Sequence, residues 1–120
     1  MSRVIDIAKH VYKTLGHGHT EALYHRAMEA GLRIQNIQYE TEKIVPVSYE
    51  GFVVGHCRLD LVTDQVAVWE LKSIAAIKAK EITQLKRYME ITGLHRGYVI
   101  NFPTNGGDVE IHEENNNVDI

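Results

Sequence analysis

The chain has 120 residues, of which 16 are acidic and 13 basic, so its formal net charge is −3. Apolar residues make up 44% of the sequence and charged residues 24%, a composition typical of one globular domain over residues 1–120. A chain of this length can fold without disulfide bonds or a structural metal, and its one cysteine, Cys57, has no partner for an internal disulfide. The sequence shows neither an apolar run of membrane-spanning length nor a secretory leader, so we expect a cytoplasmic protein that is neither secreted nor bound to a membrane.

The charges are unevenly distributed along the chain. Five acids and no Lys or Arg occur between residues 103 and 120, whereas residues 72–96 hold six basic residues and two acids. The basic segment could face a polyanion such as nucleic acid, or it could be the solvated face of a helix. Charge alone does not separate these two interpretations.

Two amphipathic helices are predicted at the start of the chain. The first covers residues 4–15 and ends at Gly16, which suits a left-handed C-terminal cap. The second begins after Thr20, a favourable N-cap residue, and continues to residue 33 or 34. Its predicted inner face consists of apolar residues at helical spacing, namely Leu23, Ala27, Ala30 and Ile34.

Three antiparallel strands are predicted between residues 38 and 71. The apolar period changes there from helical spacing to two, and β-branched and aromatic residues recur. Turn residues occur at Glu50-Gly51 and at 63–65, which divides the segment into three strands. Pro46 indicates that the first of them lies at a sheet edge or contains a bulge.

The remainder of the chain predicts a helix and further strands. A helix is expected from Lys78 to Thr92 and a strand at 96–102, with a turn at 105–108 and a short strand at 109–111. Residues 113–120 are polar and we expect them to fray. A helix that connects two strands favours a parallel pairing, so we predict an α/β or α+β fold with one mixed sheet flanked by helices.

The third predicted strand holds the residues of most chemical interest. Because side chains alternate along a strand, Glu70 and Lys72 project from one face while Trp69 and Leu71 project from the other. Another carboxylate, Asp60, lies in the apolar part of the preceding strand. Charged groups in such surroundings either form ion pairs, here Glu70 with Lys72 or Asp60 with Arg58, or bind a cation such as Mg²⁺ through their oxygens.

The spacing of these residues resembles the signature of the PD-(D/E)XK nuclease superfamily. Asp60 is followed by Glu70-Leu71-Lys72, and the predicted α-β-β-β-α-β order is similar to the restriction-endonuclease-like core. Gly18-His19-Thr20-Glu21-Ala22-Leu23-Tyr24 matches the G-x-x-E-x-x-Y motif of the GxxExxY branch. The other matching segments, in the order and approximate spacing of that branch, are Leu15-Gly16, Arg58-x-Asp60, Gln84-Leu85-x-x-Tyr88, Thr92-Gly93 and Asn101-Phe102. The likeness covers residues 4–102.

The resemblance implies a role for each matching position. Asp60 and Glu70 would be the central metal ligands, Glu21 an additional carboxylate, and Lys72 the catalytic lysine. Gln84 would orient substrate or the attacking water. Tyr24 and Tyr88 share a helix face with Glu21 and Gln84 respectively, which is compatible with a wall around the site. For both tyrosines, packing in the core with a satisfied hydroxyl is the favoured interpretation.

Two positions depart from the family pattern. Gly16-His17-Gly18 stands where the family usually has Gly-Pro-Gly, which makes this loop less rigid. Leu59 stands in place of the proline that precedes the aspartate in the superfamily's name. Neither change removes a proposed metal ligand.

The resemblance implies a nuclease that uses Mg²⁺ or Mn²⁺ to hydrolyse phosphodiester bonds, with DNA favoured over RNA as substrate and a homodimer as one possible state. The basic residues on or just before the last predicted helix would contact phosphates, namely Lys78, Lys80, Lys86 and Arg87. One alternative is a nucleic-acid-binding or assembly module that retains the fold but not the activity. Another is a zinc protein built on His17, His19 and His25.

The shared metal site also makes a prediction about strand register. A two-residue turn at Asp64-Gln65 would place Asp60 opposite Trp69, and the two carboxylates would then point to opposite faces. We therefore predict a three-residue turn over 64–66, or a bulge in one of the two strands.

Overall fold

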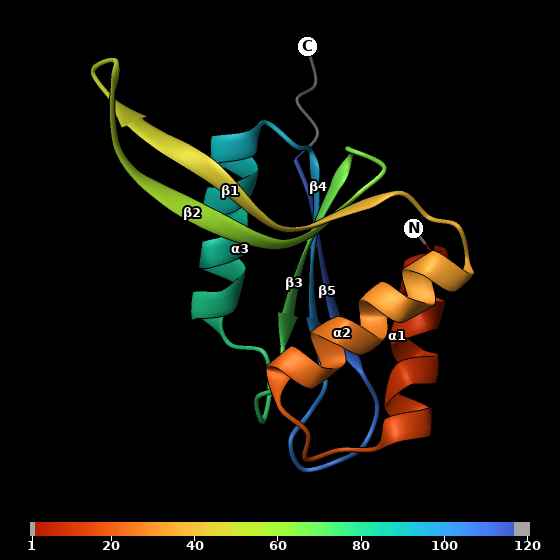
Figure 1. Cartoon of the computed structure of the whole chain (residues 1–120). Coiled ribbons are helices and arrows are strands. Elements are labelled where there is room, and N and C mark those ends of the chain that lie inside the picture. Colours follow the sequence, from red (N-terminus) through yellow and green to blue (C-terminus); the bar gives the residue numbers. More distant parts are fainter. Residues whose placement is uncertain (1, 117–120) are drawn as a thin grey trace.

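The computed structural model describes residues 2–116, which form helices and strands in the order α-α-β-β-β-α-β-β (Figure 1). The helices are α1 (Ser2–Leu15), α2 (Glu21–Ile34) and α3 (Ala79–Thr92). The strands are β1 (Tyr39–Tyr49), β2 (Phe52–Thr63), β3 (Ala67–Lys72), β4 (Arg96–Asn101) and β5 (Glu110–Asn115). None of the helices within residues 2–116 is long and apolar enough to cross a membrane.

The helix ends lie where the sequence places them. Gly16 follows α1 with a φ of 77°, and its N–H donates to the carbonyl of Tyr12 at 2.8 Å. At the start of α2 the Thr20 hydroxyl accepts a hydrogen bond from the Leu23 N–H at 3.2 Å. Gly93 ends α3 with a φ of 74°. Each cap uses local interactions, which is why the sequence predicts it.

The five strands form one mixed sheet in the order β1-β2-β3-β4-β5. Neighbouring strands pair antiparallel except β3 and β4, which run parallel because α3 connects them as a crossover. The predicted mixed sheet is therefore confirmed. Pro46 lies in the edge strand β1, and a register shift between Val47 and Ser48 marks a bulge close to it.

The β1–β2 hairpin extends beyond the rest of the sheet (Figure 1, upper left). Strand β2 pairs with β1 from Phe52 to Thr63, but with β3 only from Leu61 to Thr63. The hairpin turn at Glu50-Gly51 has positive φ at both residues, 50° and 83°, as a two-residue turn between twisted strands requires.

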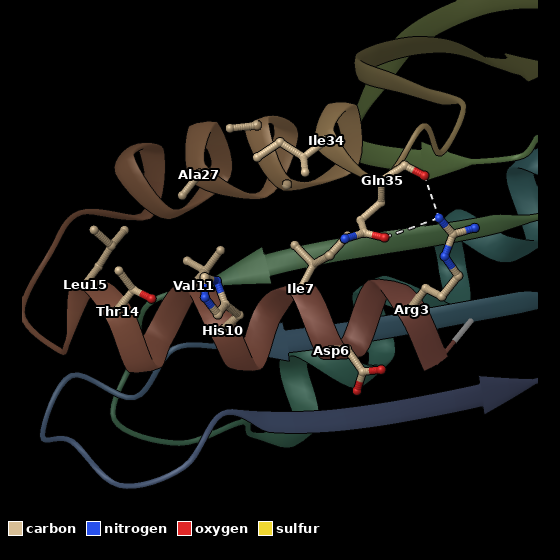
Figure 2. Close-up of a pocket in the computed structure, with 12 residues that line it drawn as sticks. Arg3, Asp6, Ile7, His10, Val11, Thr14, Leu15, Ala27, Ile34 and Gln35 are labelled. Atoms are coloured by element: carbon tan, nitrogen blue, oxygen red, sulfur yellow. Dashed lines mark hydrogen bonds between the residues drawn. The ribbon is translucent and has the colours of Figure 1, made fainter.

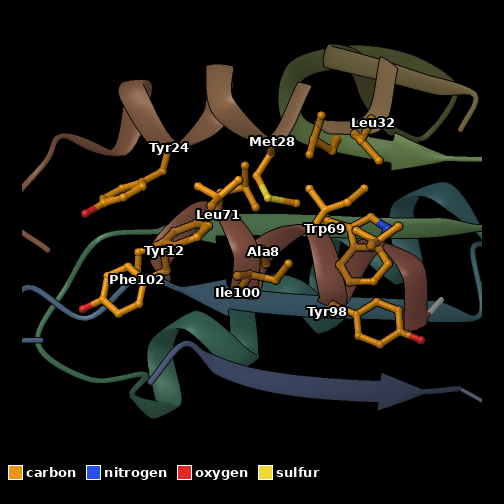
Figure 3. Close-up of a cluster of buried hydrophobic side chains, with 14 of the residues drawn as sticks. Ala8, Tyr12, Tyr24, Met28, Leu32, Trp69, Leu71, Tyr98, Ile100 and Phe102 are labelled. Carbon is orange, nitrogen blue, oxygen red and sulfur yellow. The ribbon is translucent and has the colours of Figure 1, made fainter. Parts of the chain in front are cut away.

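Helices cover both faces of the sheet. Helices α1 and α2 pack on one face, where the side chains of Trp69, Leu71 and Tyr98 are buried (Figure 3). Helix α3 packs on the other face through Leu85 and Met89, against buried residues of β2, β3 and β4. The larger of the two apolar clusters is the one beneath α1 and α2.

The predicted inner face of α2 is wrong except for Ala27, which is partly buried against the core. Leu23 and Ile34 are 38% and 76% exposed, and the side chains that α2 buries are Tyr24, Met28 and Leu32. Both sets have helical spacing, so periodicity does not choose between them. The helix buries the set with the larger apolar side chains, because burial free energy scales with apolar area.

The predicted frayed segment is also wrong in part. Strand β5 continues to Asn115, where the sequence predicts a short strand at 109–111 and disorder from 113. It pairs with the open edge of β4, with Tyr98 opposite Glu113, and the Tyr98 hydroxyl donates to the Glu113 carboxylate at 3.0 Å. The free edge of β4 supplies backbone hydrogen-bond partners for residues 113–115. The polar composition of those residues gives no sign of this pairing. Residues 117–120 lie outside the described residues.

Candidate active site

The turn between β2 and β3 has the length that a shared carboxylate site requires. Thr63 pairs with Ala67 and Leu61 with Trp69, so the loop contains the three residues 64–66. The prediction of a three-residue turn is confirmed. In this register Asp60 and Glu70 are neighbours on adjacent strands and point to the same face of the sheet, the one that α3 covers.

Glu70 is a buried acid with an unsatisfied oxygen. Its side chain is only 4% exposed, and its Oε1 atom has no hydrogen-bond partner. Burial, followed by the negative charge of Asp60, raises the pKa of Glu70 to about 9. A buried polar atom without a partner costs free energy, so such atoms usually have a ligand or a functional role.

Asp60 is fixed in place by the neighbouring strand. Its Oδ2 accepts a hydrogen bond from the backbone N–H of Leu71 at 2.8 Å. The residue is half-buried and lies where the β1–β2 hairpin separates from β3. Its carboxylate is thus held on the sheet beside Glu70 while remaining open to solvent on one side.

Lys72 and Glu21 complete the group of charged residues. Lys72 lies two residues after Glu70 on the same face of β3, and its positive charge opposes the upward shift in the pKa of Glu70. Glu21 is the first residue of α2. Burial raises the pKa of its carboxyl group, whereas the nearby Lys72 charge lowers it and Asp60 raises it. The structure therefore brings together four residues from three separate segments of the chain, α2, β2 and β3.

The ion-pair interpretation of these charges is not supported. Within residues 2–116, no salt bridge joins Glu70 to Lys72 or Asp60 to Arg58. The same part of the chain also contains no set of three His, Cys, Asp or Glu side chains already arranged as a metal site. The carboxylates lie near one another, but none of them supplies a hydrogen-bond partner for Glu70 Oε1.

Helix α3 contributes the polar wall of the site. A surface hollow is lined by residues of α2, β3 and α3, among them Glu21, Lys72 and Gln84, whereas Asp60 and Glu70 do not line it. The Gln84 amide donates to the Tyr88 hydroxyl at 2.9 Å, which fixes the orientation of the amide. Burial, followed by the negative charge of Glu70, raises the pKa of Tyr88.

The four predicted phosphate contacts separate into two groups. Lys80 and Arg87 line the same hollow as Gln84. Lys86 points elsewhere and lies 3.9 Å from the Glu114 carboxylate of β5. Lys78 is the N-cap of α3, and its backbone N–H donates to Glu81 at 2.8 Å. Only part of the basic segment therefore faces the candidate site.

Tyr24 has the core role that the sequence favours. Its side chain is fully buried and stacks on Phe102 with ring centroids 4.4 Å apart. Its hydroxyl donates to the carbonyl of Gly16 at 2.5 Å, which ties α2 to the end of α1. Neither Tyr24 nor Tyr88 lines the hollow that contains Lys72 and Gln84.

The three histidines of the zinc alternative diverge. The Nε2 of His19 lies 2.9 Å from the carbonyl of Leu15, and that of His25 lies 2.8 Å from the Thr41 hydroxyl. His17 lies against the turn at Gly106. These positions give no common point for an ion.

Sequence reasoning singles out Asn101 as part of a matching segment but assigns no role to it or to Glu110, and in the structure the two form a buried polar clamp. Asn101 is fully buried, donates to the carbonyl of Ile74 at 3.0 Å and to Glu110 at 2.7 Å, and accepts from the Ile74 N–H at 2.9 Å. Glu110 also accepts from the Ile77 N–H at 3.2 Å. These bonds hold the loop that joins Lys72 to α3. The signal in the sequence is an asparagine at the end of the apolar strand β4.

Comparison with known proteins agrees with this geometry. Residues 1–113 match the PD-(D/E)XK nuclease superfamily. The chain belongs to this superfamily. Its fold is similar to the crystal structure of SSO0001, with a TM-score of 0.62 and 20% sequence identity, over 82% of this chain and 50% of that one. The chain thus spans about half the length of SSO0001. No curated protein matches the sequence.

Proposed function

We propose that this superfamily member is a metal-dependent nuclease of the GxxExxY branch. The observation that carries the proposal is the buried Glu70 carboxylate, whose Oε1 lacks a partner although Asp60 and Lys72 are its neighbours. Three further residues that the family motifs single out, Glu21, Asp60 and Lys72, lie around this carboxylate.

Mg²⁺ or Mn²⁺ fits the donor set. Hard divalent cations bind carboxylate oxygens, and Mg²⁺ commonly uses one or two protein carboxylates while substrate phosphate and water supply the other ligands. Asp60 and Glu70 would hold the ion, and Glu21 would add a third carboxylate from α2. A cation would satisfy the unpartnered oxygen of Glu70 and offset the repulsion between Glu70 and Asp60. When bound, the ion supplies Lewis-acid activation of a phosphodiester and of water.

The protein's own residues position the reacting groups. Lys72 stabilises the negative charge that develops on the phosphate in the transition state, because its side chain extends from the last residue of β3 into the hollow. Gln84 has its amide nitrogen held by Tyr88, so its oxygen remains free to accept a hydrogen bond from water or from a nucleotide. Lys80 and Arg87 bind flanking phosphates at the edge of the hollow. DNA is the favoured substrate.

A second candidate function is a nucleic-acid-binding module without turnover. The observation that favours it is that no three metal-ligating side chains among residues 2–116 already form a metal site. Such a module would bind nucleic acid through Lys80 and Arg87 but would not cleave it.

Incubation with a substrate panel separates the two functions. The panel contains single- and double-stranded DNA and RNA, with Mg²⁺ or Mn²⁺ or with a chelator. The nuclease proposal predicts cleavage that requires the metal and is lost in Asp60→Ala, together with weaker Mn²⁺ binding measured by calorimetry. The matched control is Asp108→Ala, which removes an exposed acid from a loop. Metal-independent cleavage, or equal cleavage by both variants, would contradict the proposed site.

A further inference from the structure

The outer part of the β1–β2 hairpin exposes one edge of strand β2. This strand pairs with β3 only from Leu61 to Thr63, so within residues 2–116 no strand pairs with the side of residues 52–57 that faces away from β1. Figure 1 shows this end of the hairpin projecting past the other strands. Successive backbone groups of a strand point to alternate sides. Part of the N–H and C=O groups of residues 52–57, here called the β2 edge segment, are therefore available to another chain.

The composition of the β2 edge segment favours strand pairing. It reads Phe52-Val53-Val54-Gly55-His56-Cys57, with aromatic and β-branched residues, no proline and no Lys, Arg, Asp or Glu. The opposite edge of the hairpin, on β1, is protected, because Pro46 lacks an N–H donor and a bulge follows between Val47 and Ser48. The two edges of the hairpin are therefore unequal, and the β2 edge is the one suited to bind another strand.

The side chains at this end of the hairpin are apolar and exposed. Phe52 is 73% exposed and Val54 is 63% exposed, and Tyr49, which pairs with Phe52 across the turn, is exposed as well. A two-stranded hairpin is marginally stable in water by itself, and a contiguous exposed apolar surface usually marks an interaction site. The groove between α1 and α2 is another apolar surface (Figure 2), but its lining charges Arg3 and Asp6 have opposite signs, and helical backbone groups bond within each helix. The hairpin, by contrast, combines apolar side chains with an available backbone edge.

We propose that the β2 edge segment pairs antiparallel with the same segment of a second copy of this chain. Between residues 44 and 57 the sequence has one acid, Glu50, and no Lys or Arg. Two copies therefore approach without like-charge repulsion, whereas a nucleic acid finds no cation there to contact its phosphates. Antiparallel pairing centred on Val54 sets Glu50 of each copy level with Arg58 of the other, so the charges that flank the segment attract. This two-fold arrangement uses the same surface on both copies and closes as a dimer.

Sedimentation equilibrium of the whole chain, without nucleic acid or metal, tests the proposal. The wild type should form a dimer. Val54→Lys should raise the dissociation constant of the dimer by about tenfold or more, because two like charges then meet at the centre of the pairing. The matched control is Val66→Lys, which changes an exposed valine of the β2–β3 turn and should leave the dimer intact. Val54→Glu alone should also be monomeric, and mixing it with Val54→Lys should restore a dimer, because the charges at the centre are then opposite.

Amide hydrogen exchange locates the interface. Exchange within residues 52–57 should slow when the dimer forms, because their outward N–H groups then donate to the second copy. Slower exchange confined to α1 and α2 would place the interface at the groove between those helices and overturn the proposal.

The sedimentation result can also overturn it. A wild type that stays monomeric at every concentration, or a Val54→Lys dimer as tight as that of the wild type, would contradict self-pairing of this edge. A monomeric wild type whose affinity for single-stranded DNA falls in Phe52→Ala would identify nucleic-acid bases as the occupant instead. Circular dichroism checks the fold of each variant, and His56→Lys, in the same segment, replaces Val54→Lys if that variant does not fold.

Discussion

The two faces of strand β3 differ sharply although their residues alternate in the sequence. Trp69 and Leu71 face α1 and α2 and are completely buried in apolar surroundings. Glu70 and Lys72 face the side of α3 and place two titratable groups there, Glu70 buried and Lys72 half-buried. Within this one strand, the residues on one face stabilise the core and the residues on the other face belong to the candidate site. The two sets alternate because a shift of one position along a strand changes the face of the sheet.

The side-chain polar atoms on the two faces also differ in whether they have hydrogen-bond partners. The indole Nε1 of Trp69 donates to the Thr63 hydroxyl at 2.8 Å, and the indole stacks on Tyr98 with centroids 3.9 Å apart. The Trp69 side chain thus has both a hydrogen-bond partner and an aromatic packing partner within the fold. Glu70 Oε1, by contrast, has no partner. A buried polar atom without a partner destabilises the fold, and such atoms are often found at functional sites. The α3 side of the sheet is therefore the candidate active site.

The largest expected effect is on the apolar face. Trp69→Ala should lower the free energy of unfolding by about 3–5 kcal/mol, because it removes a large buried side chain and leaves a cavity. Denaturant titration followed by circular dichroism measures the loss. Val66→Ala, at an exposed position of the neighbouring turn, is the control and should stay within about 0.5 kcal/mol of the wild type. Equal effects of the two changes would refute the assignment of the main core to this face.

Lys72→Ala should affect activity and leave the fold intact. We expect cleavage to fall by about two orders of magnitude, with metal and nucleic-acid binding retained, because the ammonium acts on the transition state. Lys72→Arg should not restore the rate, since the guanidinium is planar and differently hydrated. Single-turnover cleavage assays measure the rate and thermal unfolding checks the fold. Loss of folding in Lys72→Ala would favour a structural ion pair instead.

The pH dependence of stability should report on Glu70. Burial and then the charge of Asp60 raise the pKa of Glu70 from 4.5 to about 9 in the folded protein. Between these values the folded state holds a proton that the unfolded state releases, so the metal-free protein should lose stability as pH rises through this range. Glu70→Gln removes the titrating group and should flatten this loss. Denaturant unfolding in the presence of a chelator, repeated between pH 4.5 and pH 9, measures this dependence. Equal slopes of unfolding free energy against pH for the wild type and Glu70→Gln would show that the pKa of Glu70 is not raised.

The smallest expected effect concerns the basic residues of α3. Replacing Lys80 and Arg87 together by alanine should weaken nucleic-acid binding and reduce the slope of log affinity against log salt by about two, since each phosphate contact contributes roughly one. Lys86→Ala is the matched control on the same helix and should leave the slope unchanged, because Lys86 lies beside Glu114. Fluorescence anisotropy over a salt series measures the affinity and the salt slope for each variant. A slope that depends on Lys86 and not on Arg87 would place the substrate on the other side of α3.

Local signals allowed much of the fold to be predicted. Gly16, Thr20 and Gly93 mark helix ends through contacts within a few residues, so the sequence predicts them accurately. Alternation alone placed Trp69 and Glu70 on opposite faces of one strand. The need for one carboxylate site then predicted the three-residue turn at 64–66, which the register of β2 and β3 confirms.

Other features depend on contacts between distant segments and could not be predicted in this way. Which stripe of α2 is buried depends on the sheet it packs on, and both stripes have the same period. The length of β5 depends on the free edge of β4, and the direction of Lys86 depends on Glu114 in that added strand. The sequence by itself determined where the elements begin and which residues could carry chemistry, because caps and alternation are local. Only the tertiary structure decided which of those residues meet, because burial and pairing energies belong to surfaces formed by segments far apart in the chain.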